Sequence, residues 1–531
     1  MKNVFLAGML VLSFIGVAQL PMTNKAKLTE YSESAEKIKY TDRPKLLGQI
    51  GTDLFAVNFG KRDISIIKYN KKYQKVNTVV FDSKYQDEKL DSHYPLIVGD
   101  ELLIIGDYYS KEESKTKMVI MSLNTNLGVK KDFKVVAEIE SGEKKLFGKN
   151  RGSFDIVLSE DEQSFAIQVN KPYDKDEEEY FKFKVYDNEL ELQWEEEFNI
   201  PIEDRYFSLD DVYLSSDMSV YLVGVAYKSG AERRASRREG EATYSHYLVK
   251  VDDGDVYHKS VELDGQFITD LKFGFGKNNQ IICSGFYSDK GTYSIKGAYF
   301  MSLDEDFDVV KSSTIPFTFD LMVENYSDKQ KKKAEKKKDK GKAKDMEMYE
   351  YDLDDVIIRE DGSAVMIAEQ YYVRVTVTTS TDANGNTTTR TTYHYYYNDL
   401  LVINISPNGE IEWARKIPKR QYSTNDGGYY SSYGVIETDN NIYFVYTDNI
   451  KNFDGTAKKG RTYYYTTRQK EQVLVLVTMK GTGNYEKEIL KIGSRKDGYY
   501  RLKSAIEVGD KALVFPKYDK KKMTLTKVEL K

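Results

Sequence analysis

One short pattern returns seven times along this chain and limits what it can fold into. Each copy is an apolar strand, a turn of Asp, Asn or Gly, and a second strand of alternating polar and apolar residues. A strand–turn–strand unit that recurs every few tens of residues is typical of a β-propeller. The copies lie at 66–81, 119–136, 183–200, 248–263, 299–317, 401–418 and 475–492.

The stretches between the copies predict the number of blades. Two more strand-like segments precede each copy, and the second is usually the most apolar, as in an inner strand covered on both faces. After the seventh copy come three strands (500–508, 511–518 and 522–530), while 37–40 near the N-terminus has no hairpin partner. We therefore expect an all-β fold, a single β-propeller of eight four-stranded blades closed by pairing the N- and C-terminal strands. Seven blades is the alternative, if one unit is a decorated hairpin.

The N-terminus predicts export. A short positive start is followed by an apolar run at 4–17 and by the small-x-small sequence Gly16-Val17-Ala18. This pattern indicates a secretory signal peptide over 1–18, with an uncleaved membrane anchor as the alternative. The only cysteine, Cys283, is far from the cleavage point, so a lipoprotein anchor is excluded. We expect a periplasmic, outer-membrane-associated or secreted protein, with a linker at 19–34, the propeller at 35–531 and no transmembrane anchor after cleavage.

A Lys-rich segment interrupts the repeat at 327–346. Its core, 329–344, holds ten Lys against one Glu and one Asp, although the whole chain has a formal charge of −5. Low complexity and the near absence of apolar residues predict a disordered insertion. Because the remaining chain is acidic, we expect no binding to nucleic acid.

Tyrosine is the unusual residue, with 43 Tyr against 24 Phe and 2 Trp. Several lie in a segment at 371–397 that predicts a long hairpin turning at Asn384-Gly385. A lone hairpin cannot bury both of its faces, and Tyr suits protein interfaces and sugar stacking. The candidate binding residues are Tyr371, Tyr372, Tyr393, Tyr395, Tyr396, Tyr397, Tyr463, Tyr464 and Tyr465.

No local motif for catalysis or metal binding is present in the sequence. The four histidines show no metal-ligand spacing, with His246 and His258 expected on consecutive strands of one blade. The acidic runs coincide with predicted hairpin turns, where Asp and Asn are expected anyway. We therefore expect no cofactor, no metal and no catalytic residues. Propeller enzymes nevertheless assemble sites from several blades, and the residues placed to do so at the central channel are His93, Asp210, Asp211, Asp354 and Asp355.

One stretch carries a resemblance. Residues 391–421 read TTYHYYYNDLLVINISPNGEIEWARKIPKRQ. This stretch resembles a segment of uncharacterised secreted β-propeller proteins of Bacteroidetes-type bacteria. The resemblance implies an exported propeller and supplies neither catalytic residues nor a ligand.

Two functions remain open at this stage. The first is an exported, non-enzymatic β-propeller that binds a protein or a cell-envelope component through its Tyr-rich extensions. The alternative is a glycan-binding protein, hydrolase or lyase with a site at the mouth of the central channel. The sequence does not decide the oligomeric state.

Overall fold

The computed structural model is built almost entirely of antiparallel sheets. It describes residues 20–37, 43–60, 63–82, 84–141, 144–145, 148–149, 151–173, 176–263, 265–276, 280–289, 294–324, 326, 328–340, 346–359, 361–455, 461–519 and 522–531. The predicted signal peptide at 1–18 lies outside these residues. No helix in the described part of the chain is long and apolar enough to cross a membrane.

Six sheets of four strands each make up most of the described chain, and their strands follow sequence order. Four of these sheets are β2–β5 (Lys45–Ile50, Asp53–Phe59, Asp63–Tyr69, Lys75–Asp82), β8–β11 (Ser92–Val98, Glu101–Ser110, Lys115–Leu123, Val129–Glu140), β14–β17 (Ser153–Leu158, Ser164–Asn170, Glu178–Asp187, Leu192–Glu203) and β18–β21 (Phe207–Leu214, Val220–Tyr227, Tyr244–Asp252, Asp255–Val261). The other two are β22, β23, β25 and β26 (Phe267–Phe275, Ile281–Ser288, Gly297–Leu303, Val309–Pro316) and β33–β36 (Tyr433–Thr438, Asn441–Asp448, Glu471–Lys480, Tyr485–Ser494).

Two larger sheets carry a fifth short strand. One comprises β28 (Tyr351–Ile358), β29 (Ala364–Thr381), β30 (Thr387–Ile405), β31 (Ile411–Ile417) and β32 (Gln421–Thr424). The other joins β1 (Ala26–Lys37) to β40 (Lys522–Leu530), β39 (Ala512–Tyr518), β37 (Tyr499–Tyr500) and β38 (Ile506–Glu507). Short pairs elsewhere are β6 with β7 (Lys84–Tyr85, Glu88–Lys89), β12 with β13 (Lys144–Lys145, Gly148–Lys149) and β24 with β27 (Ser294–Ile295, Met348–Tyr349).

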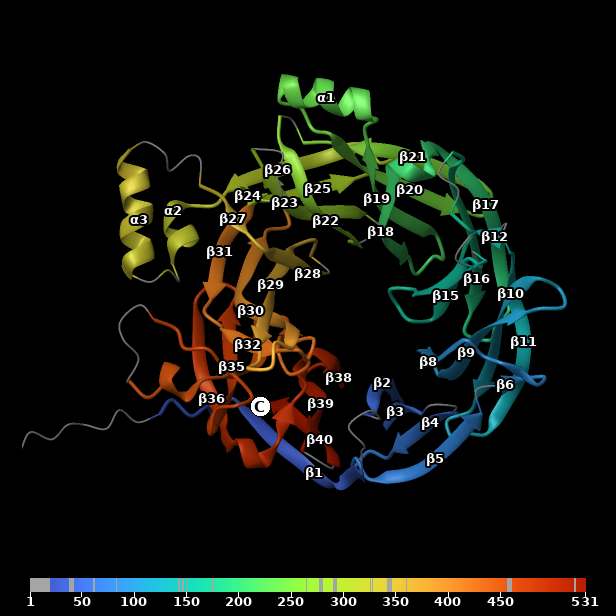
Figure 1. Ribbon diagram of the computed structural model, residues 1–531, viewed down its shortest axis with the longest axis horizontal. Coiled ribbons are helices and arrows are strands. Elements are labelled where there is room, and N and C mark those ends of the chain that lie inside the picture. Colours follow the sequence, from blue (N-terminus) through green and yellow to red (C-terminus); the bar gives the residue numbers. More distant parts are fainter. Residues whose placement is uncertain are drawn as a thin grey trace, which may run out of the picture.

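The sheets are arranged around a common centre, with the blue strand β1 beside the red β39 and β40 (Figure 1). β1 pairs antiparallel with β40 from Ala26 opposite Leu530 to Lys37 opposite Lys522. The same sheet packs on the first one, because Leu525 shares a core cluster with Leu54 and Ile67. Part of the expected linker at 19–34 therefore forms β1. The closing strand that pairs with β40 is thus β1, whereas the sequence predicted the segment 37–40, of which 38–40 lie outside the described residues.

Neighbouring sheets pack face to face through their apolar inner strands. Leu54 to Val57 of β3 are almost fully buried, and so is the whole of β23. The two tryptophans add a polar link across these contacts. Trp194 Nε1 donates to the Met218 carbonyl at 3.0 Å and Trp413 Nε1 to the Gly481 carbonyl at 2.8 Å, each in a turn of the following sheet. The repeated Trp in the sequence is thus a repeated connection between sheets.

The expectation of disorder is wrong for most of the Lys-rich segment, which forms helix α3 (Asp328–Asp339). Lys, Gln, Ala and Glu all have high helix propensity, and that preference outweighs the lack of apolar residues here. The helix is held at its side, since Ala334 is buried and the Lys338 ammonium lies 4.7 Å from the ring centroid of Phe319 in α2 (Phe319–Val323). Another helix, α1 (Gly230–Glu239), lies between β19 and β20 and ends at Gly240.

Candidate functional site

The predicted hairpin exists and projects from its sheet. β29 and β30 stay paired from Tyr371 opposite Tyr397 to Thr381 opposite Thr387. Eleven residues per strand correspond to about 35 Å of extension. The Asp382 carboxylate accepts the backbone N–H groups of Asn384 and Asn386, each at 2.9 Å, and Gly385 takes the positive φ that this turn needs. We call residues 371–397 the projecting hairpin.

One face of the hairpin base is a stack of aromatic rings. Tyr372 and Tyr396 lie opposite each other with ring centroids 4.6 Å apart. Tyr422 of β32 and Tyr464 cover them, at 5.1 and 6.2 Å from Tyr396. Three of the predicted contact tyrosines are therefore partly covered by the chain itself.

The other face changes character along its length. At the base, Tyr397 is buried against Tyr371, with ring centroids 4.7 Å apart, and against Gly428, where a Cβ would meet the Tyr397 ring at 2.2 Å. Further out, this same face presents Val373, Val375, Val377 and Tyr393, which are 40, 55, 63 and 46 % exposed. We call these four residues the valine stripe; Tyr395, opposite Val373, is half-buried beside them.

The remaining predicted tyrosines support the base instead of extending it. Tyr465 is buried, donates its hydroxyl to Gln472 Oε1 at 3.0 Å, and exchanges backbone hydrogen bonds with Arg420 and Tyr422. Tyr463 and Tyr464 are half-buried, and the Asn452 side chain holds the Tyr463 backbone. The runs of Tyr pointed to the base of the projecting hairpin. The segments that cover this base, around Tyr422 and Tyr464, come from elsewhere in the chain, and the spacing of residues in the sequence does not reveal them.

Beneath this base lies a buried polar network that joins two sheets. Lys419 is 0 % exposed and forms an ion pair with Glu369, which is 3 % exposed. The Lys419 ammonium also donates to Gln421 Oε1 at 3.2 Å, and Ser432 Oγ donates to Glu369 Oε2 at 2.8 Å. The Gln421 amide continues to the Thr447 carbonyl at 2.9 Å. Strands β29, β32 and β34 are thereby fixed at the root of the hairpin.

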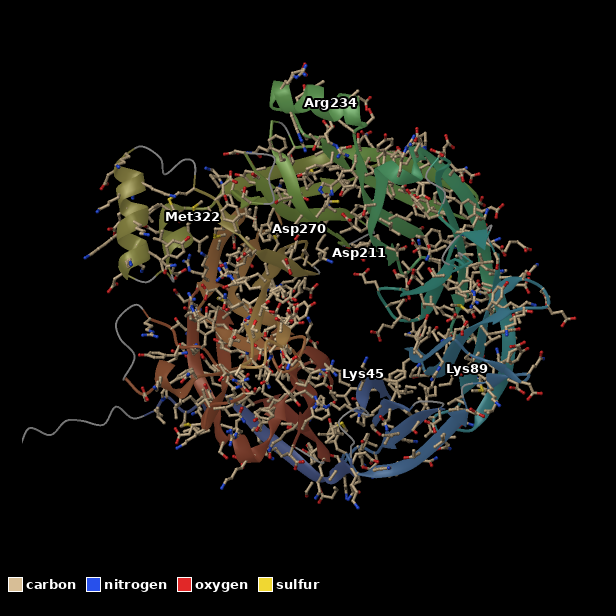
Figure 2. All side chains as sticks on the ribbon, viewed as in Figure 1. Lys45, Lys89, Asp211, Arg234, Asp270 and Met322 are labelled. Atoms are coloured by element: carbon tan, nitrogen blue, oxygen red, sulfur yellow. The ribbon has the colours of Figure 1, made fainter. Side chains whose placement is uncertain are left out.

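Acidic residues on the innermost strands occupy equivalent positions. β18, β22 and β28 each carry a β-bulge, followed by Asp211, Asp270 and Asp355 respectively. Bulges re-aim side chains and are common beside functional sites. Asp211 and Asp270 lie at the edge of the central opening in Figure 2.

Asp270, Asp354 and Asp355 have raised pKa values, and the acids on these strands have different partners. Burial raises the pKa of Asp270 to about 6 and that of Asp354 to about 6, with the charge of Glu369 adding to the latter. Lys272 pairs with Asp211 at 3.0 Å, whereas Asp354 accepts the Tyr433 hydroxyl at 2.7 Å.

The remaining channel candidates do not complete a common site. Burial raises the pKa of Asp210 and lowers that of His93, whose ring lies 6.3 Å from that of Phe59 on the neighbouring sheet. Within the described part of the chain, no three His, Cys, Asp or Glu side chains are grouped to hold a metal ion.

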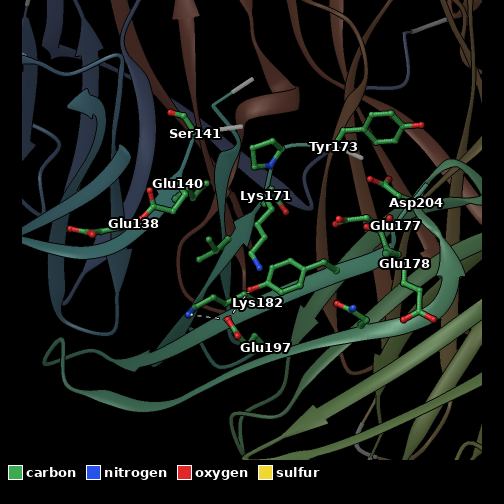
Figure 3. A pocket seen from close by; sticks show the side chains of 17 residues that line it. Glu138, Glu140, Ser141, Lys171, Tyr173, Glu177, Glu178, Lys182, Glu197 and Asp204 are labelled. Atoms are coloured by element: carbon green, nitrogen blue, oxygen red, sulfur yellow. Dashed lines mark hydrogen bonds and ion pairs between the residues drawn. The ribbon is translucent and has the colours of Figure 1, made fainter. Parts of the chain in front are cut away.

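A pocket that the sequence did not indicate lies beside β11, β15, β16 and β17 (Figure 3). Its volume is about 920 Å³. Burial and then the charge of Asp204 raise the pKa of Glu179 to about 8. The Lys171 ammonium lies 3.4 Å from the ring centroid of Tyr180, whose hydroxyl donates to Glu197 at 2.9 Å. The only sign of this pocket in the sequence is the acidic run 176–179. Asp204, which interacts with Glu179, follows the hairpin formed by β16 and β17.

Comparison with known proteins gives no family. No family model and no curated protein matches the chain. Solved structures that align with it include the WD40 domain of SCAP from fission yeast, with 8 % identity over 96 % of this chain and 99 % of that one and a TM-score of 0.40. The polysaccharide lyase Uly1 aligns with 12 % identity over 85 % of this chain and 92 % of that one, with a TM-score of 0.35. A protein of unknown function from Bacteroides caccae aligns with 11 % identity over 71 % of this chain and 94 % of that one, with a TM-score of 0.27. At such TM-scores these likenesses carry no argument about function, and the fold class stands on the sheet topology.

Proposed function

We propose that this chain is an exported, non-enzymatic β-propeller that binds a protein partner through the projecting hairpin. The valine stripe carries the proposal. Exposed valines also occur on outermost strands, such as Val309 and Val310 of β26 at 52 and 66 %, but the hairpin gathers three Val and one Tyr on one face of an element that stands away from its sheet. Clustered apolar side chains on an exposed element mark interaction surfaces.

The edge of the hairpin suggests how a partner binds. The Tyr371 N–H still donates to the Glu350 carbonyl at 2.8 Å. Beyond Tyr371, β29 pairs only with β30 among the described strands, so its outer edge offers N–H and C=O groups to another strand. An extended segment of a partner can add to such an edge through backbone hydrogen bonds, and every second side chain of that segment can then contact the valine stripe. The partner segment we expect is therefore extended and carries apolar residues at alternate positions.

The test removes the stripe without removing the strand. V373T/V375T/V377T keeps β-branched residues, so the hairpin should persist while its apolar area falls. The matched control is V309T/V310T, which alters equally exposed valines on β26. In crosslinking pulldowns from host cells, we expect the triple variant to lose partners that the control retains. Recovery of the same partners by both variants contradicts the proposal.

The alternative function, a glycan-binding protein, hydrolase or lyase at the channel mouth, is supported by Asp211, Asp270 and Asp355 after equivalent bulges. A D270N/D355N variant addresses it. Turnover or binding of a polysaccharide that is lost in this variant, with the pulldown unchanged, would favour the alternative over the hairpin.

We also propose that the scaffold is an eight-bladed propeller whose last blade joins both ends of the chain. The pairing of β1 with β40 supports this count. Loss of residues 20–37 should then expose β40 and cause aggregation, whereas an unaffected monomer would contradict closure by β1.

Export itself is tested at the N-terminus of the mature protein. Cleavage after Ala18 predicts that the protein recovered from the host envelope or medium begins at Gln19. Recovery of an intact Met1 would contradict the signal peptide.

A further inference from the structure

A second pocket lies where β20, the end of α1 and the start of β22 meet. Its volume is about 410 Å³, within the usual range of small-molecule sites. The pocket is lined by His246 and Tyr244 of β20, by Gly240 and Glu241 after α1, and by residues 261–263 and 265–268, which connect β21 to β22. It is separate from the central opening and from the valine stripe.

His246 is the residue that needs an explanation. It is 5 % exposed, and neither ring nitrogen makes a hydrogen bond of normal geometry with the described residues. The Ile268 backbone forms a hydrogen bond with one ring nitrogen that opposes the fall in the pKa of His246, and its carbonyl also accepts the Tyr244 hydroxyl at 2.7 Å. Buried polar groups in native proteins nearly always have partners, so at least one nitrogen of this imidazole is left for a ligand in the pocket.

The protonation state of the ring decides what that partner can be. Burial lowers the pKa of His246 to about 4, so the ring is neutral near pH 7. A neutral imidazole donates from one nitrogen and accepts at the other. A hydroxyl group can satisfy either nitrogen because it both donates and accepts, whereas an ammonium group only donates and a phosphate mainly accepts.

The pocket walls fit the same class of ligand. The Tyr244 ring lies edge-on to His246 at 6.0 Å, and Phe267 and Leu263 add apolar surface. Glu241, Glu262 and Gln266 supply polar side chains around it. The Lys228 ammonium is already 3.5 Å from Glu241 and 2.8 Å from Ser236 Oγ, so it does not stand ready for an anion.

We propose that this pocket binds a neutral polyhydroxylated ligand, such as a sugar unit, whose hydroxyl groups hydrogen-bond to the His246 ring. Aromatic faces beside hydroxyl-binding groups are the usual means of sugar recognition. This site is distinct from the glycan site considered at the channel mouth, and it does not depend on the hairpin.

The chain contains only four histidines, which makes a direct measurement possible. In protein labelled with 15N-histidine, H246F assigns the His246 ring signals by their loss. Titration with hexoses, N-acetylhexosamines and their short oligomers should shift those signals saturably in at least one case. Spermidine and inorganic phosphate, as cationic and anionic probes, should not shift them.

Affinity in variants completes the test. We expect H246F to weaken binding of the active probe about tenfold, as for the loss of a buried hydrogen bond. The control H258F alters an exposed ring on the adjacent strand, which contacts Tyr247, and should bind like the wild type. If H246F does not fold, E262A is the second variant, because Glu262 is exposed yet lines the pocket. If no hydroxylated probe shifts the ring signals, only water occupies the pocket and the proposal is overturned. Wild-type affinity in H246F would also overturn it. Where H246F does not fold, wild-type affinity in E262A would do so instead.

Discussion

The buried ion pair between Lys419 and Glu369 gives the sharpest prediction about how the hairpin is held. In K419M, the Glu369 carboxylate stays 3 % exposed and loses its cation. Breaking one side of a buried pair costs about 3–5 kcal/mol, because a charge is left without compensation. E369L should cost a similar amount, since it leaves the Lys419 ammonium buried and unpaired.

The double variant K419M/E369L should be more stable than either single variant. Replacing both charges with apolar groups is often close to neutral. What remains is the Ser432 hydroxyl, which loses its acceptor on Glu369, at a cost of about 1–2 kcal/mol. We therefore expect the double variant to lie about 1–2 kcal/mol below the wild type. The two single losses should be strongly non-additive.

The size of the thermal effect follows from the length of the chain. At roughly 2 cal/mol/K per residue, the unfolding entropy of a chain of this length is about 1 kcal/mol/K, so 3–5 kcal/mol lowers the midpoint by only about 3–5 °C. Urea titration is the better assay, with fluorescence and circular dichroism compared to detect intermediates. A K419M variant within about 1 kcal/mol of the wild type, or a double variant no better than the singles, would refute the account of a desolvated pair.

Three further changes test the scaffold. Burial opposes ionisation of Glu30 in β1, but hydrogen bonds from Lys491, Lys517 and Tyr500 outweigh it and lower its pKa to about 2 from an ordinary 4.5. This stabilisation is present above pH 4.5 and is lost as the pH falls through about 2. The difference in unfolding midpoint between wild type and E30Q should therefore shrink over that range, and a constant difference would contradict the account. In G285A, the new Cβ would lie 1.9 Å from the Asp270 carbonyl oxygen, so backbone must shift and soluble yield should fall sharply, whereas G362A, with open space around it, should express normally despite its positive φ. W413F should cost about 1 kcal/mol through the lost hydrogen bond to Gly481, measured by urea titration, and an unchanged midpoint would show that the link carries no stability.

The repeated pattern predicted the sheets well because each blade obeys local rules. The apolar inner strands expected just before the copies at 66–81 and 119–136 are β3 and β9. Alternation and continuous apolar runs are properties of a strand and its immediate neighbours, so they can be read from one stretch of sequence. The hairpin turn at Asn384-Gly385 follows from the same kind of local chemistry.

The features that the sequence did not indicate depend on contacts between distant segments. β1 is polar and alternates weakly, and what makes it a strand is the edge of β40, about 500 residues later. Tyr397 and Tyr465 look like their neighbours in sequence, yet Gly428 and the strand around Tyr422 bury them. The pockets beside Glu179 and His246 each combine segments from two or more elements, and no spacing rule joins them.

The buried network and the valine stripe together explain why the hairpin is suited to binding. A free two-stranded ribbon is only marginally stable in water, so its exposed end would sample many conformations and lose affinity through ordering. Here Lys419, Glu369 and Gln421 tie the root of the hairpin to two sheets, and the stack on Tyr396 stiffens its base. If this rigidity matters, K419M should weaken partner capture even under conditions where the protein remains folded. K419M/E369L should restore capture together with stability. Weak capture in both variants would instead mean that the charges themselves, rather than the rigidity they provide, contribute to recognition.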